Sequence, residues 1–220
     1  MDRITDAFVW PFRDPDWLGK LAIIGLILLI PILGGMNGLG WMLAALDRLR
    51  AGDERLPSAN FNYLGRGFPL FLVTTVYYLA LLLVGALLYV PATVILATEG
   101  RDSSSGVLVA IGASLLTLSF SVVSLGSLAL TFAAPSIVLA VSRGGISGGL
   151  RVDAIWRMAR SSLVNTLIAG LMLIAAHFIA SLGLVVCCIG VVFTNAYALA
   201  MEAWIVRSFE IGSPPATRAT

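Results

Sequence analysis

Residues 161–201 read SSLVNTLIAGLMLIAAHFIASLGLVVCCIGVVFTNAYALAM, a run of 41 residues without Asp, Glu, Lys or Arg. An α-helix rises about 1.5 Å per residue, so a single helix of this length would be roughly twice as long as the ~30 Å hydrocarbon core of a bilayer is thick. We therefore expect the run to cross a membrane twice, over 163–186 and 190–208, with a turn near 187–190.

Three further runs lack charged residues, and they cover 21–46, 67–98 and 103–142. Hydrophobic residues make up 59% of the chain and charged residues only 12%, whereas soluble domains carry about 25% charged residues. The composition predicts one integral membrane domain over 1–209, followed by a flexible cytoplasmic tail over 210–220. The net charge of +2 is too small to indicate nucleic-acid binding.

The basic residues predict how the chain is oriented, because short cytoplasmic loops collect Lys and Arg. If 21–46 forms a hairpin, thirteen of the fourteen basic residues lie on one side of the membrane, and only Arg101 lies on the other. If 21–46 were a single span, the split would be ten against four. We therefore expect a multi-pass protein of the cytoplasmic (inner) membrane with both termini in the cytoplasm.

The predicted fold is an all-α polytopic transmembrane helix bundle with four long spans and a short N-terminal helical hairpin. The expected spans are 18–33 and 36–50 for the hairpin, then 67–98, 107–134, 163–186 and 190–208. The hairpin arms are short, so we expect a re-entrant or strongly tilted pair. The run 103–142 is too long for one upright span, which predicts a break near Ala134 and Pro135.

Two segments are expected to lie at the cytoplasmic interface. Near the N-terminus, Trp10 and Trp17 suit the headgroup zone, and Asp14 is the expected N-cap of the first helix. Residues 150–160 form an amphipathic helix on which Arg157 and Arg160 share the polar face. Such a basic amphipathic helix is typical of contact with anionic headgroups.

One helix of the bundle carries a stripe of hydroxyl residues at helical spacing. They are Ser114, Thr117, Ser121, Ser124 and Thr131. Small hydroxyl residues let helices approach closely in lipid, so we interpret the stripe as a helix-packing seam. The alternative, a polar path for a substrate, would normally include an ionisable group, and this helix has none.

Polar residues inside the last run are the candidates for chemistry in the membrane. His177 and Glu202 are ionisable, and intramembrane ionisable groups are costly enough to be functional candidates. Counting from the expected turn, they lie at similar depths and nearly face each other. Asn165 and Asn195 add amide groups. In a purely structural interpretation, Glu202 pairs with Arg207 or extends to the cytoplasmic interface, and His177 bonds a neighbouring helix. In a functional interpretation, the residues form a proton-linked site, or His177 binds a haem or chlorophyll-type pigment.

Patterns typical of enzymes or metal sites do not occur in the sequence. It contains one His and no HExxH, GxSxG or Walker motif, and its adjacent Cys187 and Cys188 match no metal or redox spacing. We expect no catalytic activity and no metal site, we expect the two cysteines to be packing residues, and the cofactor is left unknown.

Three motifs together resemble a known family. They are PFRDPDWL at 11–18, IPILG at 30–34 and LRAGDERLP at 49–57. In this combination the chain resembles the bacterial and archaeal membrane proteins catalogued as domain of unknown function 4013. The family pattern continues with Trp and acidic residues, where this chain has SANFN at 58–62. The resemblance implies a membrane protein and carries no activity, cofactor or site residues.

Two classes of function remain open, with a third behind them. The first is a structural or accessory subunit of a larger membrane complex, with other membrane proteins and the lipid bilayer as partners. The second is a transporter of small molecules or lipids, because the helix broken at Pro31 and its following glycines resembles the discontinuous helices of transporters. The third is a pigment- or haem-binding subunit that uses His177.

Overall fold

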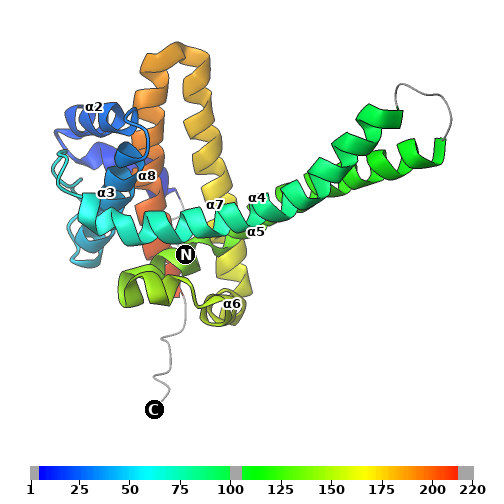
Figure 1. Ribbon diagram of the computed structural model, residues 1–220. Coiled ribbons are helices and arrows are strands. Elements are labelled where there is room, and N and C mark those ends of the chain that lie inside the picture. Colours follow the sequence, from blue (N-terminus) through cyan, green and yellow to red (C-terminus); the bar gives the residue numbers. More distant parts are fainter. Residues whose placement is uncertain (1–4, 100–105, 213–220) are drawn as a thin grey trace. The chain divides into compact units, whose positions relative to one another are not determined.

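The computed structural model describes residues 5–99 and 106–212 (Figure 1). Within these ranges the regular structure is entirely helical, with eight α-helices, two short 3-10 helices and no strand. In chain order they are α1 (Asp6–Val9), η1 (Trp10–Arg13), α2 (Trp17–Leu28), α3 (Leu33–Arg50), α4 (Leu64–Glu99), α5 (Gly106–Gly149), α6 (Val152–Ser161), α7 (Leu163–Leu182), η2 (Gly183–Val186) and α8 (Cys187–Gly212).

Among the described residues, three helices are long and apolar enough to cross a membrane, which indicates a multi-pass membrane protein. They cover Leu64–Thr98, Gly106–Gly149 and Leu163–Leu182. They correspond to three of the four long spans that the sequence predicts. The fourth predicted span, 190–208, lies within α8, a continuous helix that is not among these three.

The described residues form two compact units. The first takes residues from Met1–Val73 and Thr131–Thr220, and the second is Thr74–Leu130. The helices α4 and α5 each contribute to both units. The predicted tail falls largely in 213–220, outside the described residues, as does Arg101.

The predicted N-terminal hairpin is present as α2 and α3. The chain reverses over 29–32, and Ile32 has φ of 63° and ψ of −62°. A Cβ atom added at Gly34 would run into the backbone of Ile27 and Leu28, so only glycine allows the two arms to approach this closely.

Helix α8 is the centre of the first unit. It packs against α7, α2 and α3, and Figure 1 shows it running beside α7. Alanines line its buried faces, with Ala196, Ala200 and Ala203 fully buried. A Cβ atom at Gly25 of α2 would clash with Val192, so small residues on both helices let the backbones meet.

The second unit is an antiparallel helix pair formed by α4 and α5, which lie side by side (Figure 1). Ser119 donates a hydrogen bond of 2.9 Å to the carbonyl of Gly85, and Tyr89 meets Phe120 edge to face. A Cβ atom at Gly126 would clash with Leu81. Glycines on both helices therefore set the spacing of this pair.

Two predicted break points are wrong. Helix α5 continues through Pro135, and its one non-helical residue is Gly145, with φ of 61° and ψ of −150°. Proline is tolerated inside membrane helices, whereas positive φ is readily adopted only by glycine. The turn after α7 comes at Gly183–Val186, earlier than predicted, and α8 already begins at Cys187. The side chains of Cys187 and Cys188 lie outside the described residues.

Candidate functional site

Asp14 is a buried carboxylate that joins two distant parts of the chain. Its side chain is 1% exposed and accepts hydrogen bonds from Lys20 Nζ at 2.7 Å and from the Leu56 backbone N–H at 2.8 Å. It also accepts from the N–H of Asp16 at 2.8 Å. Asp14 is therefore not the N-cap that the sequence predicts, since α2 begins at Trp17 with Asp16 in the capping position.

Further charged residues form contacts with the loop that bonds Asp14, and we call this group the Asp14 cluster. Its members are Arg13, Asp14, Lys20, Arg48, Glu54 and the backbone of Leu56. Arg13 pairs with Glu54 and with Asp6, and both Lys20 and Arg48 donate to the Leu56 carbonyl, at 3.2 and 3.0 Å. The first and third sequence motifs thus meet here.

Hydrogen bonding decides the charge state of Asp14. Burial by itself would raise the pKa of Asp14, but the hydrogen bonds from Lys20, Asp16 and Leu56 and the positive charge of Lys20 together lower it below its ordinary value. The carboxylate is ionised at neutral pH and its partners are all protein groups. The Asp14 cluster is therefore a structural contact that holds the loop at Leu56 against the N-terminal segment.

Asn37 is a second buried polar residue, and sequence reasoning missed it. It is 0% exposed, its amide donates to the Asn60 carbonyl at 3.0 Å, and its side-chain oxygen accepts from the Tyr63 N–H at 3.0 Å. These bonds hold the 51–63 loop against α3. The signal in the sequence is an Asn among four glycines in an apolar run.

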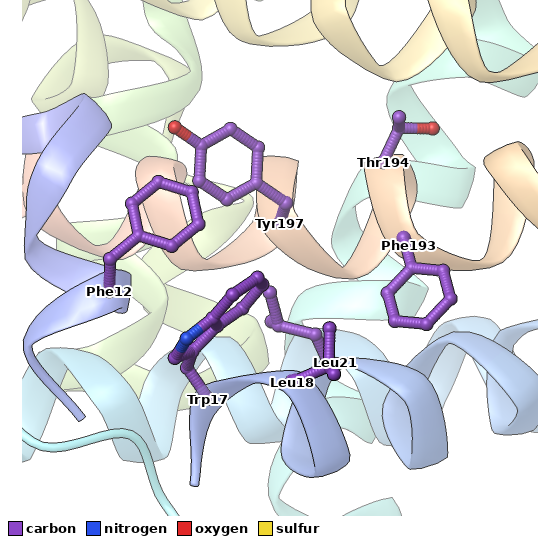
Figure 2. A pocket seen from close by; sticks show the side chains of 7 residues that line it. All are labelled: Phe12, Trp17, Leu18, Leu21, Phe193, Thr194 and Tyr197. Carbon is purple, nitrogen blue, oxygen red and sulfur yellow. The ribbon is translucent and has the colours of Figure 1, made fainter. Parts of the chain in front are cut away.

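An apolar pocket of about 360 Å³ opens between α2 and α8 (Figure 2). It is lined by Phe12, Trp17, Leu18, Leu21, Phe193, Thr194 and Tyr197. Tyr197 donates to the Phe8 carbonyl at 2.5 Å, and Thr194 donates to carbonyls of Ala180 and Gly190. With these hydroxyls engaged and no charged side chain in the lining, the pocket suits an apolar group.

The two tryptophans predicted as interfacial anchors have different environments. Trp10 is fully buried, donates to the Ala200 carbonyl at 3.2 Å and stacks on Trp204. Trp10, in η1, therefore packs against α8, and its prediction as a headgroup anchor is wrong. Trp17 is half-buried at the pocket, edge to face with Phe12.

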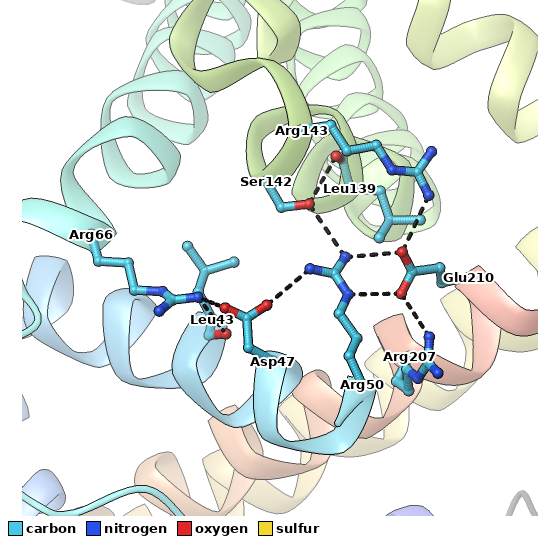
Figure 3. A network of polar contacts seen from close by, with 9 residues as sticks. All are labelled: Leu43, Asp47, Arg50, Arg66, Leu139, Ser142, Arg143, Arg207 and Glu210. Atoms are coloured by element: carbon cyan, nitrogen blue, oxygen red, sulfur yellow. Dashed lines mark hydrogen bonds and ion pairs between the residues drawn. The ribbon is translucent and has the colours of Figure 1, made fainter. Parts of the chain in front are cut away.

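Glu210, near the end of α8, binds three arginines (Figure 3). Arg50 of α3 bonds it in bidentate fashion, with nitrogen–oxygen distances of 2.9 and 3.0 Å. Arg143 of α5 donates to one carboxylate oxygen at 3.2 Å, and Arg207 donates to the other at 3.1 Å. The carboxylate thus connects the C-terminal parts of α3, α5 and α8.

Asp47 extends this group, which we call the Glu210 network. Its members are Asp47, Arg50, Arg66, Arg143, Arg207 and Glu210. Arg50 bonds Asp47 at 3.0 Å, and Arg66, at the start of α4, also pairs with Asp47. Burial by itself would raise the pKa of Glu210, but the three arginines, Arg50 foremost, lower it. The sequence signal is a pair of acid–arginine contacts at helical i, i+3 spacing.

His177 and Glu202 are brought together across the α7–α8 contact. Their Nε2 and Oε1 atoms are 3.5 Å apart, and Nδ1 lies 2.8 Å from the Leu173 carbonyl oxygen. A carbonyl only accepts, so Nδ1 carries a hydrogen and Nε2 faces the carboxyl group. The pair is thus a direct polar contact between α7 and α8.

The other intramembrane polar residues do not join this pair. Asn195 donates to Val191 in its own helix at 2.9 Å, and Asn165 donates to the Gly212 carbonyl. Arg207 bonds Glu210 rather than Glu202.

The hydroxyl stripe faces away from the α4–α5 contact. Ser114, Thr117, Ser121 and Ser124 are exposed, and the first three donate to carbonyls four residues earlier in α5. Within the described chain the stripe therefore packs against no helix of its own unit. Thr131 is half-buried and belongs to the first unit.

Helix α6 has the amphipathic character that the sequence predicts. Ile155 is buried, whereas Arg157 and Arg160 are exposed, and Arg157 pairs with Asp153 at 2.9 Å. Trp156 is 66% exposed beside them. Over the described residues, His, Cys, Asp and Glu side chains form no group of three that could hold a metal ion.

A family model described as "Protein of unknown function (DUF4013)" matches residues 23–189, about three quarters of the chain. The chain belongs to the DUF4013 family. The resemblance predicted from the motifs is thereby confirmed. No curated protein and no solved structure matches the chain.

The DUF4013 match includes the second and third motifs but begins after the first. Lys20 and Asp14 therefore lie before the matched range, while their partner Leu56 lies within it. Glu202 and Glu210 lie beyond its end. The description of the family gives no activity.

Proposed function

We propose that the protein is a non-enzymatic accessory subunit of a larger complex in the cytoplasmic membrane, and that the helix pair of the second unit contacts a partner membrane protein. The observation that carries this proposal is how little of α4 and α5 is covered by their own chain. In the most apolar 18-residue stretch of each helix, 11% of the residues are buried, against 33% for α7.

The outward hydroxyl stripe supports a protein contact on this surface. Hydroxyl side chains that bond their own backbone present a small, smooth face, on which another helix can pack closely. Ser114, Thr117 and Ser121 have this arrangement.

Purification in mild detergent tests the proposal. The wild-type protein is expected to bring down a stoichiometric membrane-protein partner, and Ser121→Trp, which puts bulk on the stripe, is expected to lose it. Leu171→Trp, at an exposed position of α7 outside the helix pair, is the matched control and should retain it. A solitary wild-type protein, or equal loss with both variants, would contradict the proposal.

A lipid-handling function is the second candidate, and the apolar pocket between α2 and α8 favours it. The region after Pro31 does not add to it, because Cβ atoms at Gly38 and Gly40 would meet Leu28 and Tyr63, so these glycines are closely packed. Transfer of fluorescent lipids in reconstituted vesicles, lost in Trp17→Ala, would establish this function over the accessory one.

Pigment or haem binding has less support. Both ring nitrogens of His177 already face protein groups, Leu173 and Glu202. An axial ligand would have to give up the Glu202 contact. A visible absorption band in the purified protein that disappears in His177→Ala would be the evidence required.

A further inference from the structure

The Glu210 network contains more positive than negative charge. Four guanidinium groups, those of Arg50, Arg66, Arg143 and Arg207, are held by only two carboxylates. All four arginines are partly exposed, Arg50 at 26%, Arg66 at 45%, Arg143 at 49% and Arg207 at 29%. Two positive charges are thus left without a counter-charge inside the network, at a surface that a ligand can reach.

The arginines differ in how much of their hydrogen-bonding capacity is used. Each of the three guanidinium nitrogens of Arg50 donates a hydrogen bond to a protein oxygen, on Glu210, Asp47 or Ser142. Arg143 and Arg207 each use one terminal nitrogen on Glu210. Their other guanidinium nitrogens have no protein partner among the described residues, and the two guanidinium groups lie on opposite sides of the Glu210 carboxylate (Figure 3).

Not all of these arginines are needed to connect the helices to one another. The bidentate Arg50–Glu210 pair already joins α3 to α8. Arg207 is on the same helix as Glu210, three residues before it, so it connects no two helices. What Arg207 adds is a positive charge and free donors on the carboxylate that Arg143 also binds.

We propose that the Glu210 network binds a phosphate group, either the headgroup phosphate of an anionic lipid or a free phosphate. Phosphate oxygens accept charge-assisted hydrogen bonds from two guanidinium groups at once, and arginine is well suited to this geometry. A phosphate accepting from Arg143 and Arg207 supplies the missing negative charge. The network lies at the ends of α3, α5 and α8, as a headgroup site requires.

The binding experiment uses the full chain in a neutral detergent and three probes measured by titration calorimetry. The probes are dihexanoyl phosphatidylglycerol, dihexanoyl phosphatidylcholine of equal chain length, and inorganic phosphate. We expect saturable binding of phosphatidylglycerol or inorganic phosphate and none of phosphatidylcholine. Binding of phosphatidylglycerol alone identifies a lipid headgroup as the source, and binding of inorganic phosphate identifies a free phosphate group.

Variants separate a binding site from a purely structural network. Arg207→Gln leaves the contacts between helices intact and is expected to weaken binding about tenfold, the effect of losing one charge-assisted hydrogen bond. Arg157→Gln on α6, which also removes one exposed arginine from an i+3 or i+4 pair, is the matched control and should bind as the wild type does. Glu210→Gln removes a competing negative charge and should bind more tightly.

Three results would overturn the proposal: no saturable binding of either anionic probe by the wild type, equal loss in Arg207→Gln and Arg157→Gln, or equal binding of phosphatidylcholine. If Glu210→Gln does not fold, Arg143→Gln decides in its place. This variant keeps the Arg50–Glu210 pair and is also expected to lose about tenfold.

Discussion

At the scale of single residues, Asp14 shows how a buried charge is accommodated. Its carboxylate accepts hydrogen bonds of 2.7–2.8 Å from Lys20 Nζ and from two backbone N–H groups. A buried charge with all its partners present is stable, but removing one side leaves the other unsatisfied. The stability of the N-terminal region therefore depends on the charge of Asp14.

We expect Asp14→Asn to lower the free energy of unfolding by about 2 kcal/mol, because an amide nitrogen cannot accept the bonds from Lys20 and Leu56. Asp16→Asn is the matched control, since Asp16 is exposed and its side chain makes no capping bond. Thermal unfolding in detergent measures both. Equal stability of the two variants would show that the Asp14 contacts contribute nothing.

The same residue predicts a pH dependence. The pKa of Asp14 is lowered in the folded chain, so its stabilising contribution is complete above the unfolded-state pKa of about 3.9 and is lost as the pH falls through the folded-state pKa. The difference in melting temperature between wild type and Asp14→Asn should be constant from neutral pH down to about pH 5 and shrink below about pH 4. A difference that grows on acidification would contradict this sign.

His177 and Glu202 should be energetically coupled. In a double-mutant cycle with His177→Gln and Glu202→Gln, we expect an interaction energy of roughly 0.5–3 kcal/mol, as for residues in direct contact. A cycle that pairs Glu202→Gln with Asn195→Leu is the control, because Asn195 bonds its own helix, and it should be additive within about 0.5 kcal/mol. Additivity in both cycles would mean that the facing pair does not interact.

The pairing of His177 and Glu202 could be predicted from the sequence, because the bilayer excludes most charged residues from membrane-spanning runs. A charge-free run makes His177 and Glu202 conspicuous, and counting helix rise from a turn brings them together. The role of Asp14 could not be predicted, because its carboxylate bonds residues outside its local sequence pattern. Asp14 has the local pattern of an N-cap, but Lys20 and the loop at Leu56 take its carboxylate, and no local rule predicts that loop's position.

At the scale of elements, the breaks in the helices follow backbone conformation. The hairpin of α2 and α3 was predictable, because Pro31 and the clustered glycines lie at the middle of an uncharged run and the arginine count required a reversal. The sequence predicts the break in α5 at Pro135, because proline removes a helical hydrogen bond. The structure puts it at Gly145, where φ is positive.

Gly145 and Gly144 provide a matched test of this point. A Cβ atom at either position would meet no other atom within 4 Å, but only Gly145 has a positive φ. Gly145→Ala should therefore destabilise the protein by about 1–2 kcal/mol through backbone strain alone, whereas Gly144→Ala should be neutral or slightly stabilising. Thermal unfolding of both variants measures the difference, and equal melting temperatures would remove Gly145 as the cause of the break.

At the scale of the first unit, several helix ends meet at the Glu210 network. The ends of α3, α5 and α8 and the start of α4 each bring an arginine to it. Because these ends are in contact, they must lie on the same side of a membrane. This agrees with the arginine count, which predicts that these segments share one side of the membrane, the cytoplasmic one.

Cysteine labelling in intact cells tests this topology. In a background with Cys187→Ser and Cys188→Ser, we expect an impermeant thiol reagent to label Ser104→Cys, which lies in the loop expected on the far side. Thr5→Cys, Ser58→Cys and Ser147→Cys, all at exposed positions, should react only after the cells are permeabilised. Thr5 and Ser58 flank the α2–α3 hairpin, so their common side depends on the hairpin alone. If Thr5→Cys reacts from outside while Ser58→Cys stays protected, the first uncharged run crosses the membrane once, and the N-terminus lies outside.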